Sequence, residues 1–269
     1  MNNILNEICR HKMQIVEIQR KKVTEKELQF LIENNEKPRG FKKAIDEKFN
    51  KKKLSIIAEI KKGSPSKGII SKNFNAGEIA KKYTDGNATC ISVLTDKKYF
   101  YGSDNDLISV KKNSIAPILR KDFIISEYQI LESRAIGADC ILLIHGVLDP
   151  QTMHRYIEIA HQLNMDVLVE THSIEELEYW VQNDKVLLGI NNRNLKNMDV
   201  DINHALKVVK KNNKNYIICE SGIKSFQQYQ NLISQGFKNF LIGEYFMKSK
   251  DTKKELLKFT NEPLKIESY

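Results

Sequence analysis

The sequence predicts a (β/α)₈ barrel, an α/β fold in which eight parallel strands alternate with helices. Eight short apolar runs recur from residue 54 onward, spaced by roughly 20 to 35 residues as βα units require. The runs are almost continuously apolar, which is typical of strands buried on both faces of a parallel sheet. With 269 residues, this number of strands favours one closed barrel over an open, doubly wound sheet.

Each expected strand is rich in isoleucine, leucine and valine, the composition of a buried strand. The runs lie at residues 54–60, 90–94, 115–119, 140–144, 167–170, 186–190, 216–220 and 240–243.

Helix signals fill the intervals between the runs. Residues 126–136 carry spaced apolar positions and end at Gly137, a suitable C-cap. Pro150 opens a segment that runs to residue 163, and proline is favoured in a first helical turn. Ser173 and Ser225 each precede a further helical segment and are expected to cap it. The chain therefore alternates strand and helix to its end.

Residues 1 to 50 precede the first strand and are expected to form a helical extension packed on the barrel. Pro38 and Gly40 mark a break within it, because both residue types interrupt a helix. We expect residues 1–269 to form a single barrel domain that includes this extension. The apolar residues expected on one face of its first helix are Ile4, Ile8, Ile15 and Ile18.

The composition limits the kinds of molecule that this protein is expected to bind. The net charge is +9, but the lysines form scattered doublets without interleaved aromatic residues, so the charge does not indicate nucleic-acid binding. The longest apolar run falls short of the roughly 20 residues that span a bilayer, and no signal peptide opens the chain, so we expect a cytoplasmic protein. The four cysteines are far apart and are expected to be free thiols, and no histidine or cysteine spacing indicates a metal.

Polar residues follow six of the expected strands, where a βα barrel carries its catalytic groups. Each alone has about even odds of being a surface charge or a rim ion pair. Together on one face they indicate an active site. The residues are Glu59, Lys61, Ser64, Lys121, Glu170, Asn191, Arg193, Glu220, Ser221 and Glu244. His145 and His172 also lie near strand ends and are expected to approach this site.

Ser221–Gly222 and Gly243–Glu244 follow the last two strands, where barrels commonly bind a phosphate through backbone N–H groups. The lysines and glutamates supply acid–base chemistry without a metal. Burial would lower the pKa of a lysine so that it donates a proton near neutral pH, or a neighbouring glutamate would hold it charged or act as the base. The residues thus predict proton transfer on an anionic, phosphorylated small molecule. They do not by themselves identify which reaction takes place.

Several stretches resemble the indole-3-glycerol-phosphate synthase family in order and spacing, over residues 38 to 250. They are residues 58–68, 92–96, 99–103, 118–124, 136–139, 169–172, 189–195 and 220–223. The resemblance implies a carbon–carbon carboxy-lyase of tryptophan biosynthesis that uses no cofactor. The family closes the indole ring of 1-(2-carboxyphenylamino)-1-deoxyribulose 5-phosphate and releases carbon dioxide and water.

The resemblance implies roles for particular residues. Lys121 would be the general acid of ring closure, Glu170 would serve the later dehydration and Lys61 would be a second proton-transfer lysine, although which lysine acts in which step stays open. Glu59 would orient the lysines. The residues implied in substrate binding are Asn191, Arg193 and Glu220 around the substrate, Ser64, Ser221, Gly222, Gly243 and Glu244 at the phosphate, and Phe100 and Phe123 at the anthranilate ring.

Two positions depart from the family pattern. Tyr245–Phe246 stands where the family has a small residue and then leucine, and His145–Gly146 is unusual after the fourth strand. The nearest competing family, phosphoribosylanthranilate isomerase, would need a Cys/Asp acid–base pair at the ends of the first and the fifth or sixth strands. Here the first strand offers Glu59 and Lys61, and a long N-terminal extension precedes it. A basic nucleic-acid-binding protein and a catalytically inactive barrel are two further possibilities. Oligomeric state and protein partners are not predicted.

Overall fold

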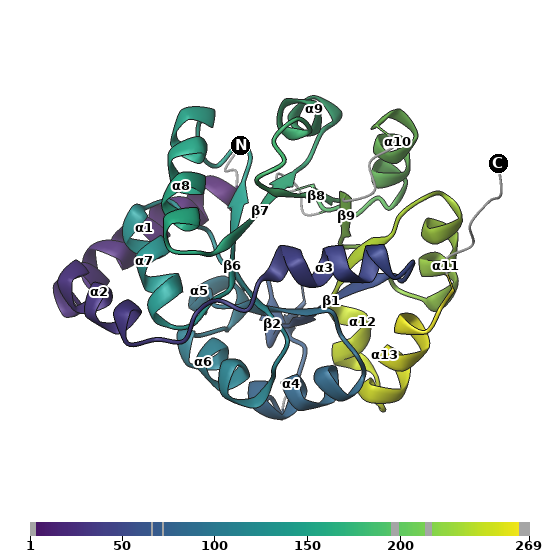
Figure 1. The fold of residues 1–269 in the computed structure, drawn as a ribbon, viewed down its shortest axis with the longest axis horizontal. Coiled ribbons are helices and arrows are strands. Elements are labelled where there is room, and N and C mark those ends of the chain that lie inside the picture. The colour runs from purple at the N-terminus through teal and green to yellow at the C-terminus, as the bar shows by residue number, and fades with distance from the viewer. Residues whose placement is uncertain (1–3, 66, 72, 195–198, 213–216, 264–269) are drawn as a thin grey trace.

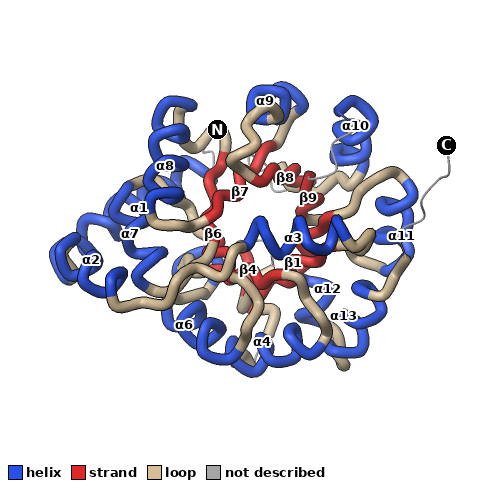
Figure 2. Tube along the Cα trace, in the orientation of Figure 1, coloured by secondary structure: helices blue, strands red, loops and turns tan. Residues whose placement is uncertain are grey.

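The computed structural model describes residues 4–65, 67–71, 73–194, 199–212 and 217–263, and the eight expected strands form one closed parallel barrel. β1 pairs with both β4 and β10, which closes the ring of strands drawn in red in Figure 2. The strands are β1 (Ser55–Ile60), β4 (Cys90–Leu94), β5 (Ile118–Lys121), β6 (Cys140–Ile144), β7 (Asp166–Thr171), β8 (Leu187–Asn191), β9 (Ile217–Glu220) and β10 (Asn239–Ile242).

One strand boundary differs from the expectation. The third run begins at residue 115, but β5 begins at Ile118. Pro117 cannot donate to a sheet ladder, and Ile115 is 83% exposed, so the first part of the run lies outside the barrel. Residue 216, the start of the seventh run, lies outside the described residues.

Helices surround the barrel, as Figure 1 shows. Ser126, Ser173 and Ser225 cap three of them by accepting backbone N–H groups, and Pro150 opens a fourth, as predicted. The helices that follow the strands are α4 (Ala76–Asp85), α5 (Lys97–Phe100), α6 (Asp104–Asn113), α7 (Glu127–Ala135), α8 (Pro150–Gln162), α9 (Ile174–Trp180), α10 (Asn203–Asn212), α11 (Phe226–Ser234), α12 (Glu244–Lys248) and α13 (Thr252–Thr260).

The N-terminal extension covers both ends of the barrel. It comprises α1 (Ile4–Lys22), α2 (Glu25–Glu33) and α3 (Phe41–Asn50). α3 crosses the amino-terminal end of the strands, where Phe41 and Ile45 are fully buried against the barrel interior (Figure 2). The backbone N–H of Lys42 donates to Asp166 Oδ2 at the start of β7, over 2.8 Å. α1 lies at the opposite end, where its first turns reach the cavity described below.

The buried face of α1 differs in part from the predicted one. Ile8 is buried as expected, but Ile18 is 49% exposed. The buried residues of the helix are Ile8, Lys12 and Val16, which follow one another at intervals of four. The apolar pattern missed this face because its central residue is a lysine.

A short hairpin after β1 was not predicted. Its strands, β2 (Gly63–Ser64) and β3 (Gly68–Ile69), are antiparallel and stand apart from the barrel. They lie within the glycine- and proline-rich segment that follows Lys61, where no apolar alternation indicates a strand.

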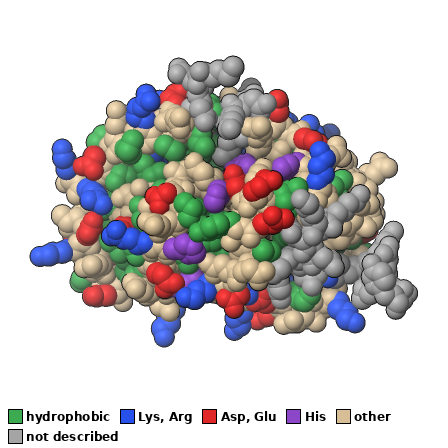
Figure 3. All heavy atoms as spheres, turned by 90° about the horizontal axis from the view of Figure 1, so that it is seen from above, with side chains coloured by type: hydrophobic (Ala, Val, Ile, Leu, Met, Phe, Trp, Pro, Cys, Tyr) green, Lys and Arg blue, Asp and Glu red, His purple; other side chains and the backbone are tan. Residues whose placement is uncertain are grey.

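Two features of the molecule concern its possible binding to a membrane or to nucleic acid. Among the described residues, no helix is long and apolar enough to cross a membrane. On the face drawn in Figure 3, Lys and Arg side chains are scattered among acidic ones.

Cys90, Cys140 and Cys219 are buried free thiols inside strands, as the sequence predicted.

Candidate active site

A cavity of 940 Å³ opens at the carboxyl ends of the barrel strands. It is lined by every residue predicted for the site except Ser64 and Glu220. Ser64 is buried in β2, and Glu220 lies fully buried at the end of β9. The predicted residues that line the cavity are Glu59, Lys61, Phe100, Lys121, Phe123, Glu170, Asn191, Arg193, Ser221, Gly222, Gly243 and Glu244.

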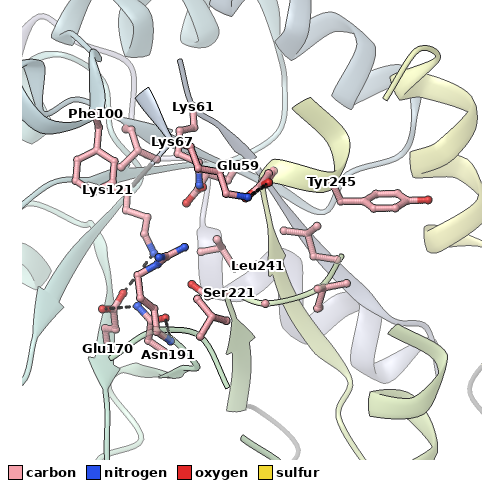
Figure 4. A pocket seen from close by; sticks show the side chains of 18 of the residues that line it. Glu59, Lys61, Lys67, Phe100, Lys121, Glu170, Asn191, Ser221, Leu241 and Tyr245 are labelled. Atoms are coloured by element: carbon pink, nitrogen blue, oxygen red, sulfur yellow. Dashed lines mark hydrogen bonds and ion pairs between the residues drawn. The ribbon is translucent and has the colours of Figure 1, made fainter. Parts of the chain in front are cut away.

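Lys121 occupies the centre of a charged cluster at the ends of three strands. It is the last residue of β5, and its Nζ lies 2.6 Å from Glu220 Oε2 and 3.3 Å from Glu170 Oε2. Figure 4 shows Lys121 and Asn191 converging on Glu170. The amide Nδ2 of Asn191 donates to Glu170 Oε1 over 2.9 Å, which fixes the carboxylate beside the ammonium.

The expectation that burial lowers the pKa of a catalytic lysine is wrong for Lys121. Burial acts in that direction, but the negative charges of Glu220, Glu170 and Glu59 outweigh it and hold the pKa well above its usual value. The other possibility, a lysine held charged by neighbouring glutamates, is the one observed. In the free protein Lys121 is therefore an ammonium ion, the protonated form that a general acid needs.

The two glutamates beside Lys121 have opposite pKa shifts. Burial opposes the ionisation of Glu170, but Lys121 and His172 hold its pKa below the usual range. Burial raises the pKa of Glu220 to about 7, with a further contribution from the charge of Glu170. Oε1 of Glu220 has no hydrogen-bond partner among the described residues. Glu170 is thus a permanent carboxylate, whereas Glu220 exchanges its proton near neutral pH.

Glu59 and Lys61 form a second ion pair at the end of β1. Lys61 Nζ lies 2.5 Å from Glu59 Oε1. Glu59 is buried, yet the charges of Lys61 and Lys121 lower its pKa below the usual value. Glu59 is therefore a carboxylate that interacts electrostatically with both lysines.

The two histidines near strand ends differ in position. His172 Nε2 lies 3.2 Å from Glu170 Oε1, so His172 reaches the cluster. His145 instead accepts a hydrogen bond from Trp180 Nε1 over 2.9 Å and is not among the residues that line the cavity. Of these two histidines, His172 is the one that can influence the charge of the cluster directly.

Part of the cavity that holds the charged cluster is lined by an apolar wall. Phe100, at the end of α5, and Phe123, after β5, have ring centroids 6.2 Å apart. Three residues of α1 complete this wall: Ile4, Leu5 and Ile8. An aromatic ring bound against this wall would be covered by apolar side chains and would share the cavity with Lys121.

The segments after β9 and β10, where the sequence predicted phosphate binding, form one corner of the cavity, the candidate anion-binding corner. Ser221 and Gly222 have φ values of 64° and 90°, in the left-handed region of backbone conformation. Gly243 and Glu244 open α12 beside them. Lys67, from the hairpin, also lines the cavity and forms an ion pair with Glu244. Lys67 was not predicted for the site, because its position in the sequence carries no strand-end signal.

Comparison with known proteins places this geometry in a family. The family model described as indole-3-glycerol phosphate synthase matches residues 5–259. The chain belongs to the indole-3-glycerol phosphate synthase family. It is 42% identical over 259 residues to the indole-3-glycerol phosphate synthase of Legionella pneumophila strain Paris, covering 96% of this chain and 98% of that protein. The Zymomonas mobilis subsp. pomaceae enzyme is 40% identical, over 94% of this chain and 96% of that protein.

Solved structures support the fold. 3-Hexulose-6-phosphate synthase from Salmonella typhimurium superposes with a TM-score of 0.60 at 14% identity, covering 77% of this chain and 97% of that one. Thiamine phosphate pyrophosphorylase from Pyrococcus furiosus gives a TM-score of 0.55 at 14% identity, covering 78% of this chain and 95% of that one. At this identity the likeness concerns the barrel alone.

The departure from the family pattern at Tyr245 does not fill the anion-binding corner. In Figure 4 the Tyr245 ring points away from the cavity interior. The ring packs against Phe246 and Phe259, with centroids 5.6 and 5.0 Å away, and its hydroxyl donates to Glu255 Oε2 over 2.7 Å. The larger side chain is therefore accommodated against α13, and the backbone of Gly243 and Glu244 stays open to the cavity.

Glu220 should make the stability of the protein pH-dependent near neutrality. The folded protein retains a proton on Glu220 up to about pH 7, whereas the unfolded chain releases it near the ordinary value of 4.5. The free energy of unfolding should therefore fall as the pH rises from 5 to 7, and then level off. We expect Glu220→Gln to lose about 2 kcal/mol of this pH dependence. Urea unfolding, followed by the fluorescence of the single tryptophan, Trp180, measures the free energy of unfolding at each pH.

The matched control is Glu33→Gln, which changes an exposed glutamate at the end of α2. It should reproduce the wild-type curve. An identical pH dependence in Glu220→Gln and wild type would show that Glu220 does not ionise near neutral pH.

Proposed function

We propose that this chain converts 1-(2-carboxyphenylamino)-1-deoxyribulose 5-phosphate to indole-3-glycerol phosphate, with the residues of this cavity in the roles given below. The observation that carries the proposal is the Lys121 ammonium held between Glu220 and Glu170, in the cavity that Phe100 and Phe123 also line. An aromatic substrate with a carbonyl group would present that carbonyl to the ammonium.

Lys121 serves ring closure. The ring carbon that bears the carboxylate attacks the substrate carbonyl carbon, a C–C bond forms, and the carbonyl electron pair moves to oxygen. Lys121 donates its proton to that oxygen, a transfer that general acids typically accelerate by about 10²–10⁴-fold. Carbon dioxide then leaves, and the electron pair of the broken bond restores the aromatic ring.

Glu220 is the group best placed to restore the proton of Lys121. Its Oε2 lies 2.6 Å from Lys121 Nζ, and its pKa of about 7 lets it hold a proton at working pH. It is fully buried, so the exchange takes place away from bulk water. Glu220 therefore acts through Lys121, which explains its position behind the lysine and outside the cavity lining.

Glu170 and Lys61 serve the dehydration. The hydroxyl group left by ring closure departs as water when Lys61 protonates it, and the nitrogen electron pair assists its departure. Glu170, ionised at neutral pH, removes the ring proton that completes the indole. Glu59, 2.5 Å from Lys61, pairs with that lysine and orients it.

The remaining residues bind the substrate. Backbone groups of Ser221, Gly222, Gly243 and Glu244 hold the phosphate, and Lys67 adds a positive charge at the same corner. Arg193, whose backbone N–H donates to Asn191 Oδ1 over 2.9 Å, is placed to pair with the substrate carboxylate. Ser64, expected at the phosphate, is buried in the hairpin and is not among the residues that line the cavity, so we assign it no contact with the substrate.

The proposal is tested by mixing the purified chain with the substrate and following indole fluorescence. A signal that rises in proportion to enzyme concentration is expected. Absence of a rise, with substrate binding retained in calorimetry, would indicate an inactive barrel and reject the proposal. Tight, salt-dependent binding of DNA that the substrate does not displace would favour a nucleic-acid-binding function instead.

We expect EDTA to leave the turnover rate unchanged. Among the described residues, no group of three or more His, Cys, Asp or Glu side chains is arranged to hold a metal ion. The acid–base groups proposed above also need no Lewis acid. The measurement compares initial rates in excess EDTA with rates in added Mg²⁺, Mn²⁺ or Zn²⁺. A rate that EDTA abolishes and one of these ions restores would contradict the expectation.

A further inference from the structure

Lys12 is buried in the middle of α1, at 6% exposure. Its Nζ lies 2.7 Å from Asp96 Oδ2 and 2.7 Å from Asp122 Oδ1. Lysine is almost never buried this fully unless it is paired, because a desolvated ammonium ion is costly. Two short ion pairs to two buried carboxylates therefore hold α1 at this point of the barrel.

The two aspartates belong to the segments that follow β4 and β5. Asp96 caps α5, because its Oδ1 accepts the backbone N–H of Tyr99 over 2.7 Å. Asp122 accepts the backbone N–H of Phe123 over 2.7 Å and the hydroxyl of Thr95 over 2.7 Å. A single ammonium ion thus ties α1 to both segments.

α1 and the two segments that Lys12 joins to it, after β4 and after β5, each contribute to the apolar wall of the cavity. α5 ends in Phe100, and the residue after Asp122 is Phe123. Ile8, one helical turn before Lys12 in α1, lines the cavity. Lys12 itself is not among the lining residues, so it contacts the wall from outside the cavity.

We infer that Lys12 is a positioning residue that assembles the aromatic subsite by holding α1, Phe100 and Phe123 against one another. The inference rests on the proposed function, since it assigns the wall to the substrate's aromatic ring. Burial alone would lower the pKa of Lys12, but Asp122 and Asp96 raise it above its usual value. The ammonium is accordingly present throughout the working pH range.

Replacing Lys12 with methionine keeps the length of the side chain and removes its charge. We expect KM to rise by at least about tenfold, because small losses of fit in an apolar subsite have effects of this size. We expect kcat to change less than about threefold, because the wall contacts the ring equally in the ground and transition states. Lys12→Arg, which can still reach both carboxylates, should recover most of the affinity.

Lys12→Met leaves two buried carboxylates without their partner and can therefore impair folding. The double variant Lys12→Met/Asp96→Asn restores the original charge balance, while Asp122 keeps Thr95 and the Phe123 backbone as partners. If Lys12 positions the wall, the double variant folds but keeps the raised KM. A wild-type KM in the double variant would show that Lys12 only balances charge, and would overturn the inference.

Amide hydrogen exchange separates this inference from the proposed function, because it needs no turnover. Exchange in residues 4–16 and at Phe123 should be faster in the double variant than in wild type, and unchanged in Lys42→Met. Lys42 pairs with Asp46 on α3, at the other end of the barrel. Unchanged exchange in the double variant would reject the positioning role, whereas an inactive wild-type chain would reject only the proposed reaction.

Discussion

Replacing Lys121 with alanine is expected to lower kcat by about 10³-fold, within the range usual for the loss of a general acid. The neighbouring ammonium, that of Lys61, is held by Glu59 and so does not take the place of Lys121 between its two glutamates. The fold should persist, because Glu220, already prone to hold a proton, can become neutral when its partner is lost. Single-turnover kinetics and circular dichroism of the purified variant measure the two effects.

Lys121→Arg separates the charge from the proton transfer. Arginine keeps a cation beside Glu170 and Glu220, but its planar guanidinium holds its N–H groups in a fixed fork and does not present a proton from the position of the Lys121 ammonium. We expect this variant to fold like wild type and to be almost as inactive as Lys121→Ala. Lys185→Ala, which removes an exposed lysine paired with Glu158, should be fully active. Near wild-type turnover in either Lys121 variant would refute its role as the acid.

Replacing Gly189 with alanine is expected to reduce kcat by roughly 10²-fold, the size of effect that a misplacement of about 1 Å can have. A Cβ at this position in β8 would stand 2.1 Å from Glu220 Oε1 and 3.3 Å from a Leu168 methyl group. The carboxylate must move, and Lys121 is hydrogen-bonded to its other oxygen. The displacement therefore reaches the proton donor, although Gly189 does not line the cavity.

The matched control is Gly77→Ala in α4. Its Cβ would also meet polar side-chain ends, at 2.7 Å from Ser109 and 2.8 Å from Asn113, but away from the cavity. A similar loss of stability with unchanged kcat is expected there. If both variants lost activity to the same extent, the effect at Gly189 would be one of general packing, not of the position of Glu220.

The strand pattern was predictable because it is local. A parallel barrel buries both faces of each strand, so the apolar runs are visible in the sequence without knowledge of their partners. The site residues followed from the same pattern, since the carboxyl ends of all strands in a barrel meet at one end. This is how Glu59, Lys121, Glu170 and Asn191 could be grouped although they lie far apart in the chain.

Features that depend on distant pairing could not be predicted. Lys12 looks like a polar interruption of an apolar face until Asp96 and Asp122 are seen beside it. The direction of the pKa shift of Lys121 depends on how closely its carboxylates approach, which burial alone does not determine. The position of α3 at the amino-terminal end of the barrel likewise depends on contacts with several strands at once.

The N-terminal extension covers both ends of the barrel, and this has a consequence for how the chain folds while it is being translated. Residues 4–50 are translated before the barrel that they cover, yet α1 faces a cavity that Leu241 and Gly243 also line. β1 closes the ring only with β10. At about 5–20 residues per second, the ribosome needs roughly 10 to 40 s to pass from β1 to β10. During that interval the apolar sides of α1 and α3 have no completed surface to cover, so nascent chains of intermediate length should be the forms most dependent on chaperones.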